Sequence, residues 1–256
     1  MQKIPHIVHY IWFGRKPIPK RMLRYISSWK TMLPNYKFML WNEDTFDISK
    51  SCQFVREAYE RKQYAFVSDY VRFYVLERYG GIYLDTDVEI LKRFDDKILD
   101  SHDVVIALDE GGYLSGSTIM ATPGNKIIKI FMSHYEDKPF IKSDGSFENE
   151  VINTHMQCAL TNFGYQIVNK FQLIKDPASK ESVALYPDDF FHVRSLTSGK
   201  LNRTENSYAI HWHTISWTSL KTRVINYLRI YLFVPIFGDN IYSRLTRILK
   251  NGRTSL

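Results

Sequence analysis

Two aspartates, Asp85 and Asp87, follow directly after the short apolar run Ile82–Leu84. Side chains alternate along a strand, so residues two apart share a face, and we expect both carboxylates to project towards one point. Two carboxylates at one point repel each other unless a cation neutralises them. Oxygen ligands of this kind suit Mg²⁺ or Mn²⁺, which commonly bridge to substrate phosphates. The pair predicts a metal and nucleotide site, and the competing interpretation is a solvated turn.

A second charged pair, Asp69 and Arg72, precedes the acids along the chain. The two residues are three apart in a stretch without Gly or Pro, so we expect them to share one face of a helix and to hold each other in place. Near a diphosphate such a pair would offer hydrogen bonds to a sugar and offset charge. The alternative is a surface ion pair of little energetic value.

Aromatic and imidazole groups supply two further candidate sites. His211 and His213 lie on either side of a tryptophan, and Ser216 and Trp217 follow. Either imidazole could complete a metal site begun by carboxylates, or could be an ordinary polar residue of a strand. Trp12 ends the first expected strand, where α/β sheets bind ligands, so it could stack on a base. Packing in the core is the alternative for Trp12.

The elements that must position these groups alternate between strand and helix, which predicts an α/β fold with a mostly parallel central sheet. We expect strands at 4–13, 36–41, 82–84, 103–108 and 117–121. We expect helices at 21–33, 54–79, 125–135 and 149–163. Residues 164–210 read as irregular, with short strands. Gly80 and Gly81 would end the longest helix and lead into the strand that carries the acids.

The composition is that of an ordinary globular protein. A chain of 256 residues with 45% hydrophobic and 24% charged residues is long enough to bury a sizeable core. Its two cysteines, Cys52 and Cys158, are too few for a disulfide scaffold, which favours a reducing cytoplasm. The first residues lack the pattern of a signal peptide, and no apolar run is long enough for a transmembrane helix.

The positive charge is concentrated at the end of the chain. Residues from Thr218 onward carry seven basic side chains and one acid, so this segment holds +6 of the net +7 and leaves about +1 for the body. A near-neutral body argues against nucleic acid as a partner. Basic amphipathic helices expected at 218–234 and 240–250 favour an anionic membrane surface. For the first of them, packing on the domain or on a second subunit in a homodimer is the alternative.

In these segments the chain resembles the bacterial glycosyltransferases with a DXD sugar-binding region, of the family-32 type related to yeast mannosyltransferases and, distantly, to clostridial toxin glucosyltransferases. The resemblance rests on four segments in the family's order: Ile4–Gly14, Ala65–Arg72, Gly80–Val88 and His211–Trp217. It implies a GT-A type, Rossmann-like single catalytic domain, which we expect over residues 1–217. The basic amphipathic segment over 218–256 would then form a helical extension. It also implies a nucleotide-sugar donor, a divalent metal and retention of anomeric configuration.

The resemblance also implies roles for individual residues. The catalytic group would be Asp69, Arg72, Asp85 and Asp87. Donor contacts would come from Trp12 at the base, Asp69 and Arg72 at the sugar hydroxyls, Tyr83 and Asp85 near the sugar and ribose, and Ser216 and Trp217 at the diphosphate. The metal ligands would be Asp87 directly, Asp85 through water, and His211 or His213. The family often has His-His-Trp where this chain has His-Trp-His, and we favour His211 because its spacing to Trp217 is kept.

The function implied is transfer of a hexose from a nucleotide-sugar, with UDP-sugars as the expected donors, to a lipid-linked or polysaccharide acceptor. Capsule, O-antigen or similar surface polysaccharide synthesis at the inner face of the membrane is the expected setting. Asp109 and Glu110 are the acids to consider as a covalent nucleophile, and neither is assigned. A phosphatase of the haloacid dehalogenase type is one alternative, although Glu89 stands where that family has Thr, Ser or Val. A non-catalytic nucleotide-sugar-binding protein is the other.

Overall fold

The computed structural model describes residues 4–162, 167, 170–175, 181–214 and 220–238. The chain divides into two compact units. The first consists of Met1–Val193 with Arg203–Trp212, and the second of Arg194–Asn202 with His213–Leu256. The boundary predicted between residues 217 and 218 lies outside the described residues, so the division into a catalytic domain and an extension stays a prediction.

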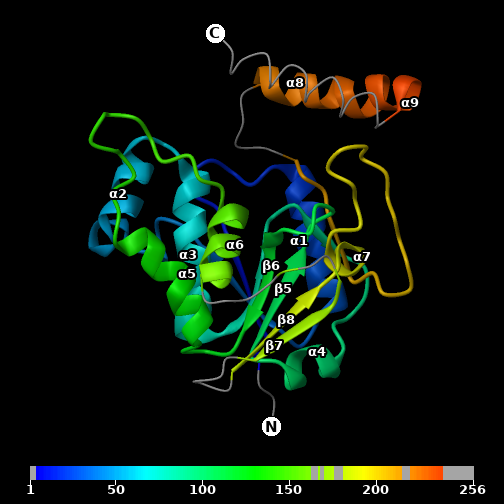
Figure 1. Ribbon diagram of the computed structural model, residues 1–256, viewed down its shortest axis with the longest axis horizontal. Coiled ribbons are helices and arrows are strands. Elements are labelled where there is room, and N and C mark those ends of the chain that lie inside the picture. Colours follow the sequence, from blue (N-terminus) through cyan, green and yellow to red (C-terminus); the bar gives the residue numbers. More distant parts are fainter. Residues whose placement is uncertain (1–3, 163–166, 168–169, 176–180, 215–219, 239–256) are drawn as a thin grey trace. The chain divides into compact units, whose positions relative to one another are not determined.

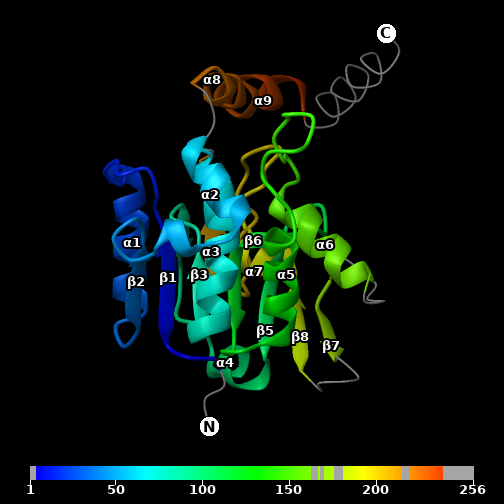
Figure 2. The ribbon, with the colours of Figure 1, turned by 90° about the vertical axis from the view of Figure 1, so that its left-hand side faces the viewer.

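The first unit is built on a seven-stranded sheet with the order β2-β1-β3-β6-β5-β8-β7 (Figure 2). Its strands are β1 (Ile7–Ile11), β2 (Lys37–Trp41), β3 (Gly81–Leu84), β5 (Val104–Leu108), β6 (Leu114–Ala121), β7 (Gln172–Lys175) and β8 (Ser182–Tyr186). The pairs β1/β2, β1/β3 and β5/β8 are parallel, whereas β6 and β7 run antiparallel to their neighbours. Five strands therefore point the same way, and the predicted α/β fold with a mostly parallel sheet is confirmed.

Helices cover both faces of this sheet (Figure 1). One face packs against α2 (Gln53–Glu60), α3 (Tyr64–Tyr79), α5 (Lys126–Glu136) and α6 (Ile152–Asn162). The other packs against α1 (Lys20–Met32), α4 (Asp96–Ser101) and α7 (Asp188–Phe191). The position of strand β3 explains why its own residues, Ile82–Leu84, form a continuous apolar run. Ile82 and Leu84 enter one hydrophobic cluster and Tyr83 the other, so the strand is buried on both faces.

The prediction of one continuous helix over Phe54–Tyr79 is wrong. Helix α2 ends at Glu60, Lys62 adopts a left-handed φ of 58°, and α3 begins at Tyr64. The turn lets the two helices pack against each other, with the rings of Phe54 and Phe66 6.4 Å apart. No Gly or Pro marks this break, because packing of the two helices outweighs the local cost of the turn.

Two glycines do mark the next break. Gly80 and Gly81 have φ angles of 61° and 100°, which only glycine adopts readily. A Cβ on Gly80 would lie 2.6 Å from Cδ of Pro123, and one on Gly81 would lie 2.6 Å from the carbonyl oxygen of Ile7. This turn ends α3 as predicted and leads the chain directly into β3.

A separate two-stranded sheet follows the acid pair. Strand β4 (Val88–Ile90) pairs antiparallel with β9 (Ala209–His211), and Val88 is opposite His211. The segment 164–210 was predicted to be irregular with short strands. It contains β7, β8 and the start of β9, and the short helix α7. The β4–β9 pairing joins residues more than a hundred positions apart in the sequence.

The described residues of the second unit include a short loop and a helix. Helix α8 (Leu220–Leu228) continues through a π-helical stretch, Arg229–Phe233, into α9 (Val234–Phe237). Arg229 donates a hydrogen bond to the carbonyl oxygen of Leu196 at 2.8 Å. The chain continues as helix through Pro235, where the sequence suggested a break, because Pro is accommodated in the first turn of α9. The helix expected at 240–250 lies outside the described residues, and within the described part no helix is both long and apolar enough to cross a membrane.

Candidate functional site

The acid pair lies in the turn between β3 and β4. The backbone N–H of Asp85 donates to the carbonyl oxygen of Ser117 at 2.9 Å, and the N–H of Val88 donates back to the carbonyl of Asp85 at 3.0 Å. The turn is therefore held by β6 on one side and by its own hydrogen bond on the other. The side chain of Asp87 is 12% exposed and that of Asp85 28%, so the solvated turn considered from the sequence is not what forms.

The pairing of β9 with β4 brings His211 to the two acids. Nε2 of His211 lies 3.3 Å from Oδ1 of Asp87 and 3.8 Å from Oδ2 of Asp85. One ligand atom from each residue lies within 4.8 Å of the others, which is a suitable spacing for a single cation. Burial alone would lower the pKa of His211, but the charges of Asp87 and Asp85 outweigh it and raise the pKa above its ordinary value. The site therefore favours positive charge, and two carboxylates with one imidazole fit Mn²⁺ or Mg²⁺.

His213 and the residues after it are placed differently. His213 belongs to the second unit, so its role as a ligand stays a prediction. Ser216 and Trp217 lie outside the described residues. Trp212, between the histidines, donates from its indole N–H to Glu89 at 2.8 Å and stacks on Tyr25. These contacts anchor the end of β9, directly after His211.

Asp69 and Arg72 form a buried pair on α3. Nη2 of Arg72 donates to Oδ1 of Asp69 at 2.6 Å, and the two residues are only 5% and 8% exposed. The surface ion pair considered from the sequence is excluded. Burial raises the pKa of Asp69 to about 6, with the positive charge of Arg72 opposing the rise and Asp85 adding to it. The pair therefore lies inside the protein beside the acid turn.

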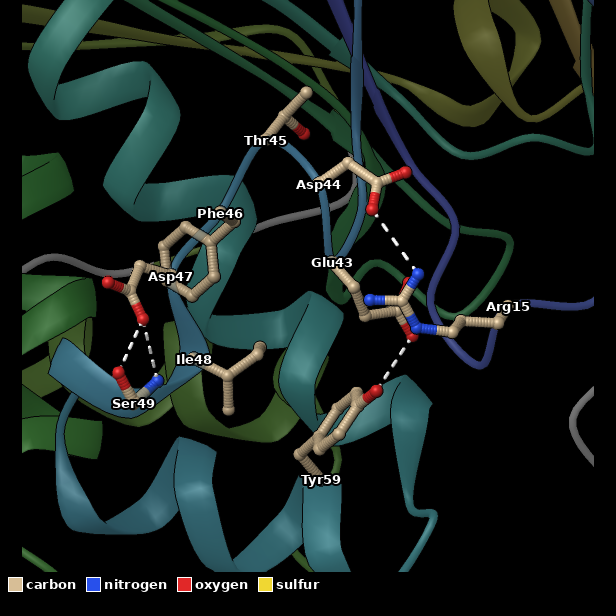
Figure 3. Close-up of a pocket in the computed structure, with 9 residues that line it drawn as sticks. All are labelled: Arg15, Glu43, Asp44, Thr45, Phe46, Asp47, Ile48, Ser49 and Tyr59. Atoms are coloured by element: carbon tan, nitrogen blue, oxygen red, sulfur yellow. Dashed lines mark hydrogen bonds and ion pairs between the residues drawn. The ribbon is translucent and has the colours of Figure 1, made fainter.

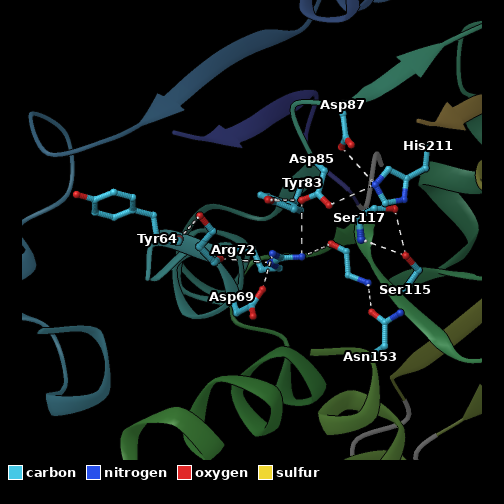
Figure 4. Close-up of polar contacts among 12 residues, drawn as sticks. Tyr64, Asp69, Arg72, Tyr83, Asp85, Asp87, Ser115, Ser117, Asn153 and His211 are labelled. Atoms are coloured by element: carbon cyan, nitrogen blue, oxygen red, sulfur yellow. Dashed lines mark hydrogen bonds and ion pairs between the residues drawn. The ribbon is translucent and has the colours of Figure 1, made fainter. Parts of the chain in front are cut away.

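Arg72 also connects this pair to the acids. Its Nη1 donates to the carbonyl oxygen of Gly116 at 2.6 Å and lies 3.8 Å from Oδ1 of Asp85. The guanidinium lies over the ring of Tyr83, 4.8 Å from its centroid. The Tyr83 hydroxyl donates to Oδ1 of Asp85 at 2.7 Å, and burial raises the pKa of Tyr83, so it stays a donor. Figure 4 shows the side chains of Arg72, Tyr83 and Asp85 directed towards one another, with His211 of β9 beside them.

The two acids are thus unequal. Asp85 is held by Tyr83 and Arg72, whereas Asp87 is the closer neighbour of His211. Tyr83, expected to contact the donor, is only 2% exposed, so in this arrangement it orients Asp85.

Several residues that the sequence did not single out complete the site. In β6, Ser115 pairs with Ala107 while Ile119 pairs with Ile106, so residues 116–118 bulge out of the pairing with β5. A Cβ on Gly116 would lie 2.5 Å from Nη1 of Arg72, which explains the glycine. The sequence offered only a general signal here, since the stretch Glu110–Gly116 after the expected strand 103–108 is rich in glycine.

This bulge is supported from two sides. Oδ1 of Asn153, on α6, accepts a hydrogen bond from the N–H of Gly116 at 3.2 Å. The amide of Asn153 also donates to Asp109 at 3.4 Å. Asp109 accepts from the N–H groups of Gly111 and Tyr113, and thereby shapes the turn between β5 and β6. On the other side, Ser117 and His192 share a hydrogen bond of 2.7 Å.

Trp12 and a surface hollow lie at the ends of β1 and β2. Trp12 is half-buried, and its indole N–H donates to the carbonyl oxygen of Lys16 at 2.7 Å. The hollow has a volume of about 450 Å³ and is lined by Arg15, Tyr59 and residues 43–49 (Figure 3). Glu43 Oε1 accepts from the N–H of Gly14 at 2.7 Å and from the hydroxyl of Tyr59 at 2.9 Å. The described lining does not include the acid pair, so stacking of a base on Trp12 stays a prediction.

Comparison with known proteins identifies the region around the acids. Residues 19–105 match the family described as the glycosyltransferase sugar-binding region containing a DXD motif. The chain is 28% identical over 134 residues to inositol phosphoceramide mannosyltransferase 1 of Schizosaccharomyces pombe. This match covers 48% of this chain and 40% of that protein. It is 32% identical over 98 residues to the uncharacterized glycosyltransferase L373 of Acanthamoeba polyphaga mimivirus. This match covers 36% of this chain and 39% of that protein. The chain thus spans about two fifths of the length of these relatives.

Among solved structures, the PaToxG glycosyltransferase is similar with a TM-score of 0.46 and 20% identity, covering 62% of this chain and 70% of that one.

The residues 19–105 that match the family contain Asp69, Arg72, Asp85 and Asp87, whereas Trp12 and His211 lie outside them. The resemblance predicted from the sequence is therefore confirmed for a DXD glycosyltransferase sugar-binding region over residues 19–105 of this chain.

Proposed function

We propose that this protein is a metal-dependent, retaining glycosyltransferase of the GT-A type that transfers a hexose from a nucleotide-sugar, UDP-linked in the first instance, to a glycan acceptor. The observation that carries the proposal is the meeting of Asp85, Asp87 and His211 at one point beside the buried Asp69–Arg72 pair. A cation site next to a buried hydrogen-bonding pair is what a sugar diphosphate requires, since it presents two charged phosphates and several hydroxyls.

Different residues would contact different parts of the donor. Asp87 and His211, with Asp85, would hold Mn²⁺ or Mg²⁺, which when bound neutralises the charge of the diphosphate. Asp69 and Arg72 would bind the sugar hydroxyls. Tyr83 and Arg72 orient Asp85, because both present donor groups to its Oδ1.

The reaction would proceed with retention at the anomeric carbon. The acceptor hydroxyl oxygen forms the new bond to that carbon on the face from which the diphosphate oxygen departs. The hydroxyl proton passes to the departing phosphate oxygen, so that no protein nucleophile is required. Asp109, one of the acids considered for that role, has its Oδ1 engaged by two backbone N–H groups, and we assign no nucleophile.

The test is stabilisation by ligands. We expect the melting temperature to rise only when Mn²⁺ is combined with one nucleotide or nucleotide-sugar from a panel of UDP and GDP compounds. Asp87→Ala should abolish the shift, whereas Asp144→Ala, at an exposed loop acid, should keep it. Absence of any shift with every nucleotide would contradict the proposal. Stabilisation without turnover of the donor would favour a non-catalytic binding protein, and release of phosphate from phosphomonoesters would favour a phosphatase.

We further propose that the acceptor is carried by a lipid, in capsule, O-antigen or similar synthesis, and that the protein binds the cytoplasmic face of the membrane from its periphery. Two observations support this. One relative is named for mannosyl transfer involving inositol phosphoceramide. In the second unit, Ile230 and Val234 are buried and Phe233 is partly buried. Most other large apolar side chains of the helix are about half exposed or more: Val224, Ile225, Tyr227, Leu228, Tyr231, Leu232, Ile236 and Phe237.

The charge of this unit favours anionic lipid as the occupant of that face. Residues 213–238 contain Lys221, Arg223 and Arg229 and not a single acid. Basic residues near an anionic surface each contribute about 1 kcal/mol of attraction. We expect the full chain to sediment with vesicles containing anionic lipid, and Tyr231→Glu combined with Leu232→Glu to abolish this. Unchanged sedimentation would refute the membrane proposal, and conversion of a dimer to a monomer by the same variant would assign the face to a second copy.

A further inference from the structure

His192 is a buried histidine next to the candidate metal site. It follows α7 directly, is 4% exposed and lies in the first unit with the acids. Its Nε2 shares a hydrogen bond of 2.7 Å with Oγ of Ser117. Its ring meets that of His211 edge to face, with centroids 4.9 Å apart and planes at 85°. One side chain thus contacts both the β6 bulge and a candidate metal ligand.

The bulge transmits this contact to the acids. The carbonyl oxygen of Ser117 accepts the backbone N–H of Asp85 at 2.9 Å. The neighbouring carbonyl, that of Gly116, accepts Nη1 of Arg72 at 2.6 Å. Ser117 is itself fixed from the other side, because its Oγ also lies 3.1 Å from Oγ of Ser115. A displacement of Ser117 would therefore move the backbone of Asp85 and the hydrogen-bond partner of Arg72 together.

Packing against His192 has a similar consequence for His211. Strand β9 fixes the backbone of His211, but the direction of its ring depends on what the ring packs against. The ring of His192 packs edge to face against it on one side, while Asp87 attracts Nε2 on the other. The imidazole is thereby turned so that Nε2 faces the two carboxylates.

We propose that His192 is a positioning residue of the metal site, acting through Ser117 on Asp85 and through ring packing on His211. The inference rests on the proposed function, since it needs the cation site, but not on the identity of the donor or acceptor. Residues that orient metal ligands from outside typically change metal affinity by about 10- to 100-fold when they are replaced. Neither the sequence spacing nor the residue type pointed to His192, because it lies 19 positions before His211 in an irregular stretch.

The experiment measures Mn²⁺ binding to the full chain by calorimetry, without nucleotide. His192→Phe keeps a flat ring but cannot bond Ser117, Ser117→Ala removes the same bond from the other partner, and His192→Gln keeps a polar atom near the position of Nε2. We expect the first two variants to weaken Mn²⁺ binding about tenfold. The double variant His192→Phe with Ser117→Ala should bind Mn²⁺ as tightly as the weaker of the two single variants, because both changes remove the same hydrogen bond. His192→Gln should bind Mn²⁺ more tightly than His192→Phe.

Controls separate this inference from the proposed function. If wild-type protein fails to bind Mn²⁺, or binds it equally after Asp87→Ala, the proposed function fails first. If wild type binds and Asp87→Ala does not, but His192→Phe and Ser117→Ala bind within about twofold of wild type, only the role of His192 is overturned. Unfolding midpoints in urea identify a variant that does not fold, and in that case the affinity of Ser117→Ala decides.

Discussion

The buried Asp69–Arg72 pair makes the sharpest prediction, because it separates structural from functional effects. Arg72→Met removes the guanidinium from a site where Asp69 is only 8% exposed. Breaking a buried pair by removing one partner costs about 3–5 kcal/mol, which is a large share of the roughly 5–15 kcal/mol that stabilises a domain. Asp69 loses the positive charge that opposes the effect of burial on its pKa, so its buried carboxyl must either stay charged without a partner or take up a proton. The carbonyl of Gly116 also loses the donor that lies 2.6 Å away.

The double variant Asp69→Asn with Arg72→Met removes both charges. We expect it to regain at least about 2 kcal/mol over Arg72→Met, since no buried charge is left unpaired. The remaining loss comes from the carbonyl of Gly116, whose unsatisfied state costs about 1–3 kcal/mol. Neither variant should transfer sugar, because the pair is also proposed to bind the sugar hydroxyls. Stability recovers in the double variant and activity does not.

Urea unfolding at pH 7.5 followed by tryptophan fluorescence measures the stability. Arg78→Met, at an exposed arginine on the same helix, is the matched control and should change stability by about 0.5 kcal/mol or less. The defect of Arg72→Met should shrink at pH 5, because the Asp69 carboxyl, with a pKa of about 6 in the intact pair, is then mostly neutral in the wild-type protein as well. A double variant as unstable as Arg72→Met would refute the unpaired-charge argument, and one with normal turnover would refute the sugar-binding role.

Three further perturbations test other parts of the structure. Gly116→Ala places a Cβ 2.5 Å from Nη1 of Arg72, so we expect loss of Mn²⁺-dependent nucleotide binding in a thermal-shift assay; an unchanged shift would show that the bulge tolerates a side chain. Tyr83→Phe removes the hydroxyl that bonds Asp85 at 2.7 Å, so the donor KM should rise while stability falls by about 1 kcal/mol, and an unaltered KM would speak against orientation of Asp85 by Tyr83. Burial lowers the pKa of His9 to about 4. The unfolded chain therefore takes up a proton first as the pH falls below about 6.5. Stability should drop by up to about 3 kcal/mol between pH 6.5 and 4, and His9→Gln should lose this slope; an equal slope in both proteins would exclude His9 as its source.

Much of the α/β framework was predictable because its signals are local. The apolar strands β1, β2, β3 and β5 are bounded by turn residues, and a strand buried on both faces reads as a continuous apolar run. Long helical stretches were also found, but their subdivision was not. The turn at Lys62 has no Gly or Pro, and it forms because α2 packs against α3.

By itself, the sequence predicted which residues could carry chemistry at the acid pair. Asp85 and Asp87 share a strand end, and Asp69 and Arg72 share a helix face, since both relations follow from the period of a single element.

Only the tertiary structure decided how these residues are arranged around one another. His211 reaches the acids because β9 pairs with β4, a contact between segments far apart in the chain. Burial of Asp69 and Arg72, orientation of Asp85 by Tyr83, and support of the β6 bulge by Asn153 and His192 all arise between elements. No periodicity within one element encodes such contacts, because they depend on the order of the strands in the sheet and on which helix covers each face.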